Sequence, residues 1–300
     1  MTRVSAILPT RGRPQKLAAT LERILSCDPA PGEVLVHTGA DDVESLELMR
    51  ARFPGVRVLT GDGESGPGGA RNGLIRAASS DWVASFDDDS YPFDRDFFAV
   101  ASRAVENRPE AGVIACTLYE RDGEPPSPTP AEPSFHRCLE FANGACLWRR
   151  SAFLRTRGHV PLKHSWCMEE QDVGLQLFAL DEQVWYAPQL RVFHDSERQH
   201  HQQAAIAGAT LANVALLAGL RYPMALWPVA FLQVMRRMTW MKNHERAAGI
   251  LPGLAMIPGR CAVHWQERTP LPLSRVWRYL SLKRRLLPNP HGPGLLPPDA

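Results

Sequence analysis

The first 90 residues repeat one pattern, in which a short apolar run is followed by a stretch with apolar residues at helical spacing. Such runs, bounded by polar residues, predict buried β-strands at Arg3–Leu8, Glu33–His37, Val56–Leu59 and Trp82–Phe86. The helices between them are expected from Pro14 to Leu25, around Leu46, Met49 and Phe53, and from Ala70 to about Ala78. This alternation predicts an α/β fold with a mostly parallel, doubly wound sheet.

A change of pattern near residue 200 predicts two parts, residues 1–200 and residues 201–300. Strand and helix signals continue to His194, with strands expected at 112–118, 141–148, 184–186 and 190–193 and helices at 94–107 and after Asp172. The last hundred residues predict helices at 204–220, 227–241 and from Leu273 onward. The stretch Gly123–Pro133, with five prolines, is expected to be a loop bordering the ligand cleft.

Charge divides the chain at the same place. Residues 201–300 hold twelve Lys and Arg against three acidic residues, a net charge of +9, whereas the first 200 residues carry −7. The split suggests that residues 1–200 bind a cation and that the basic residues 201–300 contact an anionic partner. The run 204–220 falls short of a convincing membrane span, so peripheral contact with a membrane is the sharper hypothesis and a helical subdomain packed on the sheet is the plainer one.

Three consecutive aspartates end the fourth predicted strand. Because alternate residues of a strand share a face, Asp87 and Asp89 should lie on one side and Asp88 on the other. Adjacent carboxylates stay ionised only with solvent, a basic partner or a divalent cation. A cation with oxygen ligands and a solvated acidic turn are both compatible with an isolated run of this kind.

The expected setting is a bacterial cytoplasm. The six cysteines show no paired or metal-finger spacing, which is typical of buried thiols in a reducing compartment. Met1 leads directly into a strand pattern without the long apolar core of a signal peptide. The Arg-, Ala- and Pro-rich composition suggests a bacterial genome rich in G and C, and no nucleic-acid partner is expected.

Five stretches occur in an informative order over roughly the first 195 residues. They are Ala6-Ile7-Leu8-Pro9-Thr10-Arg11, Gly69-Ala70-Arg71-Asn72-Gly73, Phe86-Asp87-Asp88-Asp89, Met168-Glu169-Glu170-Gln171-Asp172 and Val192-Phe193-His194. Together they resemble the motifs of the family 2 glycosyltransferases, inverting enzymes with the GT-A fold. The resemblance implies that residues 1–200 form a domain that binds a nucleotide sugar and carries out catalysis.

The resemblance also assigns roles to single residues. Asp89 and His194 would bind a divalent cation, Mn²⁺ or Mg²⁺, which as a Lewis acid neutralises charge on the departing diphosphate. The residues expected to contact the donor are Pro9, Thr10, Arg11, Thr38, Arg71, Asp87 and Asp88. Arginine suits the diphosphate because a guanidinium pairs with phosphate through two hydrogen bonds.

Two positions depart from the family pattern. The catalytic base, an aspartate in the family, corresponds to Glu170, and Glu169 and Asp172 remain alternatives. A base that removes the acceptor's proton contributes roughly 10²–10⁴-fold to the rate. An aspartate that reads the donor's base is replaced by Thr38, with Asp41 and Asp42 as displaced substitutes or helix caps.

These features predict transfer of a sugar from a nucleoside-diphosphate sugar to an acceptor hydroxyl. The nucleotide is expected to be UDP or dTDP, with GDP as an alternative, and the acceptor a polysaccharide, a glycolipid or a natural product. Two other hypotheses are a sugar-nucleotidyltransferase and a non-catalytic nucleotide-sugar-binding module. The first of these expects a Gly-rich loop after the first strand, where Pro9-Thr10-Arg11-Gly12-Arg13 has one glycine.

Overall fold

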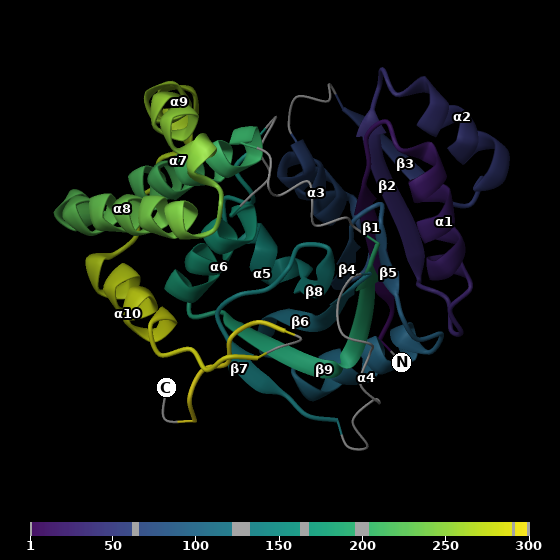
Figure 1. The fold of residues 1–300 in the computed structure, drawn as a ribbon. Coiled ribbons are helices and arrows are strands. Elements are labelled where there is room, and N and C mark those ends of the chain that lie inside the picture. The colour runs from purple at the N-terminus through teal and green to yellow at the C-terminus, as the bar shows by residue number, and fades with distance from the viewer. Residues whose placement is uncertain are drawn as a thin grey trace.

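The fold is built on one central sheet (Figure 1). The computed structural model describes residues 2–61, 66–121, 133–162, 168–195, 204–289 and 292–298. The strand order is β3-β2-β1-β4-β8-β6-β9-β5, with β7 paired to β9. Strands β1 to β4, β6 and β9 run in one direction, and β8, β5 and β7 run against them. The strands are β1 (Val4–Pro9), β2 (Glu33–Gly39), β3 (Arg57–Gly61), β4 (Trp82–Phe86), β5 (Ser90–Pro92), β6 (Ala111–Glu120), β7 (His136–Cys138), β8 (Ala145–Arg149) and β9 (Gln183–His194).

Helices cover both faces of the sheet, as the strand pattern requires. Successive strand residues point to opposite faces, so Leu8 and Ala84 join one apolar core and their neighbours Ile7 and Val83 join another. Helices α1 (Pro14–Leu25), α2 (Val43–Arg52) and α4 (Phe97–Asn107) pack in the first core. Helices α3 (Gly66–Ala77), α5 (Arg150–Leu154) and α6 (Glu169–Ala179) pack in the second. The predicted α/β fold with a mostly parallel sheet is confirmed.

The two short strands predicted near residue 190 form the single strand β9. Its pairing with β6 shifts register, because Cys116 pairs with Ala187 while Thr117 pairs with Arg191. The intervening residues, which include Pro188, form a bulge. A proline at a bulge does not need a ladder hydrogen bond, so the apolar pattern breaks although the strand continues. Conversely, the strand expected at 141–148 begins only at Ala145, whose N–H donates to Ala142 O at 3.0 Å.

Helix α3 begins at Gly66, four residues before the predicted start at Ala70. Glycine is a poor helix former, but here a larger residue would not fit. A Cβ added to Gly68 would lie 2.7 Å from Glu169 Oε1 and 2.9 Å from the Cβ of His159. Packing between α3 and α6 therefore overrides the local preference.

The C-terminal part is helical, as expected, and packs around α7. It consists of α7 (Ala204–Arg221), α8 (Trp227–Asn243), α9 (Ile250–His264) and α10 (Leu273–Lys283), joined by three short 3₁₀ turns. Close backbone contact between α7 and the start of α9 needs glycine, because a Cβ on Gly208 would lie 2.8 Å from Gly249 O. Strands β5 and β7 and helices α5 and α9 were not predicted, and most of the proline-rich loop expected at Gly123–Pro133 lies outside the described residues.

Within the described residues, α7 has the length and composition of a helix that crosses a membrane. Over half of it, 56%, is buried inside the protein. Leu211 and Leu216 of α7 are fully buried, and α8 and α9 pack against the helix. This packing gives its apolar composition a role as the central helix of the C-terminal part.

Candidate active site

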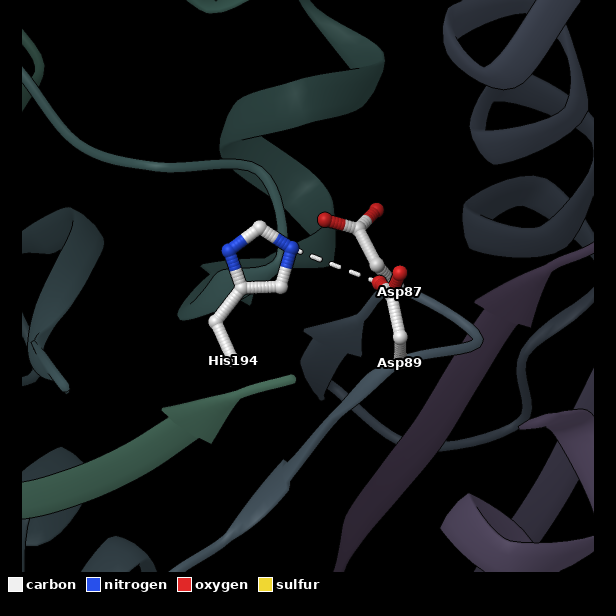
Figure 2. Close-up of side chains that lie close together, drawn as sticks. All are labelled: Asp87, Asp89 and His194. Atoms are coloured by element: carbon white, nitrogen blue, oxygen red, sulfur yellow. Dashed lines mark ion pairs between the residues drawn. The ribbon is translucent and has the colours of Figure 1, made fainter. Parts of the chain in front are cut away.

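Asp87, Asp89 and His194 converge at the carboxyl ends of the strands (Figure 2). Each offers a ligand atom, and the three atoms lie within 4.8 Å of one another. The sheet register explains how residues 105 positions apart meet, because β5 pairs with β9 and places Ser90 opposite His194. The N–H of Asp195 also donates to Asp89 O at 2.7 Å. Asp87 and Asp89 thus lie together without Asp88, but the three aspartates form a turn after β4, and Arg13 contacts both Asp88 and Asp89.

Asp87 is held by a buried arginine. Arg71 of α3 forms an ion pair with the Asp87 carboxylate and donates to Ser85 Oγ at 3.1 Å. The Asp87 side chain keeps 33% of its exposure, whereas that of Arg71 keeps 3%. Gly144 lies against the same carboxylate, since a Cβ there would collide with Asp87 Oδ2. The carboxylate is therefore fixed on one side and open on the other.

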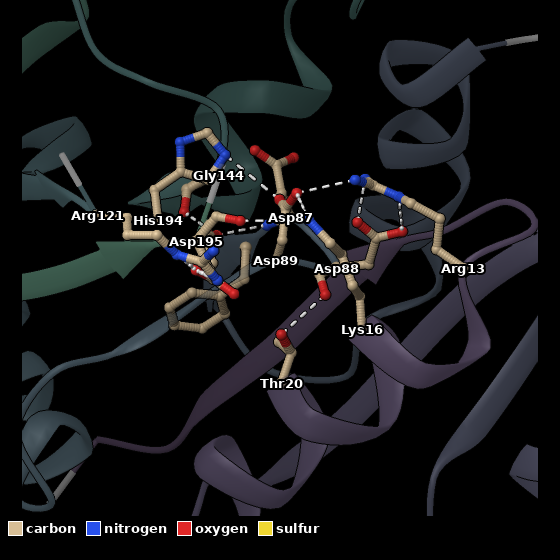
Figure 3. A network of polar contacts seen from close by, with 12 residues as sticks. Arg13, Lys16, Thr20, Asp87, Asp88, Asp89, Arg121, Gly144, His194 and Asp195 are labelled. Atoms are coloured by element: carbon tan, nitrogen blue, oxygen red, sulfur yellow. Dashed lines mark hydrogen bonds and ion pairs between the residues drawn. The ribbon is translucent and has the colours of Figure 1, made fainter. Parts of the chain in front are cut away.

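Asp88 faces the start of α1 (Figure 3). Its Oδ2 accepts hydrogen bonds from Thr10 Oγ1 at 2.7 Å and from Arg13 Nε at 3.1 Å, and Thr20 Oγ1 donates to its main-chain oxygen at 2.8 Å. The residue is 1% exposed, and burial raises the pKa of its carboxyl to about 6 against the lowering effects of Arg13 and Thr10. Asp88 thus anchors the aspartate turn to α1, and its predicted contact with the donor remains a prediction.

Asp89 is surrounded by positive groups. His194 Nε2 lies 3.3 Å from its Oδ1, Arg13 donates to its Oδ2 at 2.8 Å, and Lys16 Nζ lies 3.5 Å from the same oxygen. Burial alone would raise the pKa of Asp89, but His194, Arg13 and Lys16 lower it to about 2. Burial lowers the pKa of His194, but Asp89 and Asp87 raise it above its ordinary value. The group therefore binds positive charge strongly.

This donor set fits a divalent cation. Two carboxylates and an imidazole in reach of one point provide oxygen ligands of the kind that Mn²⁺ and Mg²⁺ prefer, together with a nitrogen that suits transition metals. Asp87, expected to contact the donor, lies in this group and offers a third ligand atom for the ion. Arg13 and Lys16 now balance the charge that an ion would neutralise.

The predicted catalytic base, Glu170, and its alternatives Glu169 and Asp172 occupy the first turn of α6, but in different surroundings. Glu169 is 3% exposed, and burial with the nearby Glu170 raises its pKa to about 8. Glu170 is half-buried, and burial raises its pKa although the charge of Arg71 lowers it. Asp172 is buried and paired with Arg221 of α7, whose Nε lies 2.6 Å and Nη2 2.9 Å from its two oxygens. Asp172 therefore joins α6 to α7.

The end of β2, the turn after it and Gly12 form a separate hydrogen-bonded group. Thr38 Oγ1 donates to Asp42 Oδ2 at 2.8 Å, and Gly12 N–H donates to the same oxygen at 2.7 Å. Asp42 also caps α2 by accepting from Ser45 N–H at 3.3 Å. Arg11 pairs with Asp41 at 2.9 Å, and both side chains are exposed. One candidate substitute, Asp42, thus lies directly beside Thr38.

Comparison with known protein families identifies the chain. Residues 5–162, more than half of its length, match the model of glycosyl transferase family 2. The chain belongs to this family. The match runs from β1 to residue 162, between α5 and α6, and includes Asp87, Asp88 and Asp89. Comparison with the sequences of curated proteins found no significant match.

Solved structures of glycosyltransferases share the fold of this family 2 glycosyltransferase. The mannosyltransferase PcManGT from Pyrobaculum calidifontis, in complex with GDP-Man and Mn²⁺, has a TM-score of 0.57 and 16% identity, covering 93% of this chain and 85% of that one. S. aureus TarS 1-349, in complex with UDP-GlcNAc, has a TM-score of 0.61 and 14% identity, covering 89% and 82%. GalNAc-T7 with UDP, GalNAc and Mn²⁺ has a TM-score of 0.59 and 14% identity, covering 91% and 59%. The predicted GT-A fold is confirmed.

In this glycosyltransferase the structure brings together most of the predicted residues. Pro9 and Thr10 end β1 beside the aspartate turn, and Arg71, Asp87, Asp89 and His194 form the central group. Arg11 lies with Asp41 instead. Sequence reasoning missed Arg13 and Lys16. Their position in the sequence could have indicated them. Arg13 and Lys16 lie at the start of α1, shortly after the end of the first strand, and their spacing of three residues places them on one helix face.

Proposed function

We propose that this glycosyltransferase transfers a sugar, with inversion at the anomeric carbon, from a nucleoside-diphosphate sugar to an acceptor hydroxyl, and that it requires a divalent cation. The convergence of Asp87, Asp89 and His194 carries the proposal. The family assignment favours glycosyl transfer over nucleotidyl transfer. The acceptor class is a hydroxyl of a polysaccharide, a glycolipid or a natural product.

The cation would be held by Asp89 and His194, with Asp87 in the same shell. Bound there, a divalent ion supplies Lewis-acid stabilisation of the diphosphate as it leaves. Arg13 and Lys16 add two positive charges on the α1 side of Asp89. Fixed positive groups aimed at developing negative charge are typical of sites that stabilise a leaving group.

Glu170 is the proposed base. A base must be ionised to accept a proton, and the carboxyl of Glu169, whose pKa is raised to about 8, holds its proton at neutral pH. Both carboxylate oxygens of Asp172 already accept hydrogen bonds from Arg221, and one of them also accepts from Gln176. Burial raises the pKa of Glu170 too, but Glu170 is the more exposed of the two glutamates and therefore the one that an acceptor can reach.

The proposed step is a direct displacement. The acceptor oxygen attacks the anomeric carbon while the Glu170 carboxylate takes its proton. The bond from that carbon to the diphosphate oxygen breaks, and its electron pair leaves with the diphosphate. The products are a glycoside of inverted configuration and a nucleoside diphosphate, and Glu170 returns its proton to solvent.

Matched substitutions at neighbouring glutamates test this assignment. Glu170→Gln should lower turnover by roughly 10²–10⁴-fold, since it removes the base but keeps the side chain's size. Glu169→Gln, which resembles the protonated side chain, should keep turnover within about threefold. Release of nucleoside diphosphate from a donor, with NMR of the product's anomeric proton, measures both rate and configuration. Equal loss in both variants, or a product of retained configuration, would contradict the proposal.

The donor nucleotide can be identified by stabilisation of the folded state. The neighbours bind both GDP-linked and UDP-linked sugars, so their ligands do not select a base. A thermal-shift panel of UDP-, dTDP- and GDP-sugars with and without Mn²⁺ should show one nucleotide raising Tm most, and only with the cation. Tight binding of a donor without turnover on any acceptor would instead support a non-catalytic binding module.

A further inference from the structure

Helix α8 presents an apolar face that nothing in the described structure covers. Trp227, Phe231 and Met235 are spaced by four residues and therefore share a face. Phe231 is 65% exposed, Leu232 59% and Met235 42%. An adjacent side of the helix is occupied, because Val234 and Met241 are buried against α7 and α9. We define the outward face of α8 by Trp227, Phe231, Leu232 and Met235. Other residues of α8, Val234 and Met241 among them, pack the helix against the rest of the protein.

Positive charge lies beside this outward face. Helix α8 carries Arg236, Arg237 and Lys242 and no acidic residue. Arg236 and Lys242 are exposed. Across residues 204–289 and 292–298 the structure describes twelve Lys and Arg against Glu245 and Glu267. An apolar face bordered by basic residues matches the interface of an anionic bilayer, where apolar side chains enter the lipid and Lys and Arg meet the headgroups.

We propose that the outward face of α8 docks this protein on the surface of a membrane that contains anionic lipids. The charge favours lipid over a second copy of the chain, because two such faces would bring the same basic helices together. Tryptophan suits the boundary between headgroups and acyl chains. Figure 1 places α8 on the side of the helical part away from β1–β4.

The docked orientation would be fixed relative to the site. Arg221, the last residue of α7, pairs with Asp172 in the first turn of α6. That turn also carries Glu169 and Glu170. A bilayer bound at α8 would therefore contact a body that is tied to the catalytic helix. The proposal does not depend on which sugar or acceptor the enzyme uses.

Vesicle flotation tests the proposal. The full chain should float with phosphatidylcholine vesicles containing about 30% phosphatidylglycerol and much less with phosphatidylcholine alone, and raised salt should weaken binding. The triple variant Phe231→Ser, Leu232→Ser, Met235→Ser should bind at least about tenfold more weakly. Replacing Arg236 and Lys242 by Gln should weaken binding about fivefold for each charge.

A matched triple variant controls for general surface change. Leu25, Val43 and Leu154 are 41%, 57% and 44% exposed on α1, α2 and α5, so their replacement by Ser should leave flotation unchanged. Both triple variants should keep wild-type Tm and far-UV circular dichroism. Equal flotation of the two triple variants, or no flotation of the wild type, would overturn the proposal. So would a wild-type dimer in light scattering that the α8 triple variant converts to a monomer.

Discussion

The candidate active site and the junction of α6 with α7 each contain a buried arginine paired with an aspartate, but the two pairs have different consequences. At the site, Arg71 is buried but its partner Asp87 keeps 33% of its side-chain exposure and lies with Asp89 and His194. At the junction, the side chains of Arg221 and Asp172 keep 1% and 0%. The partly exposed pair of Arg71 and Asp87, here called the open pair, leaves a carboxylate available to a cation. In the fully buried pair of Arg221 and Asp172, the closed pair, the two side chains bond to each other and join two helices. Between these two arginine–aspartate pairs, the exposure of the carboxylate is what separates the binding role from the structural one.

Breaking the closed pair should have the largest effect. Arg221→Met leaves the Asp172 carboxylate buried without its partner, which should lower the free energy of unfolding by about 3–5 kcal/mol. Denaturant unfolding measures the change. Adding Asp172→Leu should recover part of the loss, because the uncompensated charge disappears. A cost of less than about 1 kcal/mol for Arg221→Met would show that the junction is not the closed structural contact described above.

An exposed ion pair provides the control for that comparison. Arg275 pairs with Asp181 at the protein surface, where their side chains keep 33% and 68% of their exposure. Solvent screens such pairs, so Arg275→Met should change the free energy of unfolding by at most about 1 kcal/mol. A similar loss in both Met variants would point to the lost side-chain packing rather than to the buried charge.

A pH-dependent effect is expected from Glu169. Its pKa is raised from an ordinary 4.5 to about 8 in the folded protein, mainly by burial. The folded state therefore binds more protons than the unfolded state between these values, and stability falls as pH rises through that window, by at most about 1.4 kcal/mol per pH unit. Glu169→Gln removes this decline, so its advantage in Tm over the wild type should grow from pH 5 to pH 8. Parallel Tm curves for the two proteins would contradict this account.

The smallest effect concerns Arg13, which would compete with a bound metal ion for Asp89. Arg13→Gln should increase the affinity of the donor-free protein for Mn²⁺ about fivefold, since a half-exposed pair contributes about 1 kcal/mol. Lys16→Gln should have a weaker effect, because Lys16 Nζ lies 3.5 Å from Asp89 Oδ2 and Arg13 lies closer at 2.8 Å. Titration calorimetry with Mn²⁺ measures both. Unchanged affinity in both variants would indicate that these cations do not share a position with the ion.

The sequence predicted the features that depend on local pattern. Apolar runs and helical spacing located β1 to β4 and α1, and the predicted grouping of Asp87 with Asp89 is found, although in a turn after β4 and not in the strand. The continuity of β9 could not be predicted, because the bulge at Pro188 interrupts the apolar pattern while its pairing with β6 continues. The early start of α3 depends on contact with Glu169, which a local propensity does not contain.

The electrostatic environment of the site was the part least accessible to sequence reasoning. Arg13 and Lys16 meet Asp89 across more than seventy residues, and Asp172 meets Arg221 across forty-nine. The arginine-rich composition offers many candidate partners for each acid, so only the fold selects among them. The same selection distinguishes Glu169, Glu170 and Asp172, which are close neighbours in the chain but differ in burial and partner.

Binding of Mn²⁺ in the presence of a nucleoside diphosphate, followed by the loss of the free-ion signal in electron paramagnetic resonance, tests the central claim most directly. The wild type should bind the ion, and Asp89→Asn and His194→Gln should each weaken binding by about tenfold or more. Asp181→Asn, which alters an exposed carboxylate paired with Arg275 away from the site, should bind like the wild type. If Asp89→Asn and His194→Gln bind Mn²⁺ as tightly as the wild type, Asp87, Asp89 and His194 do not form the metal site.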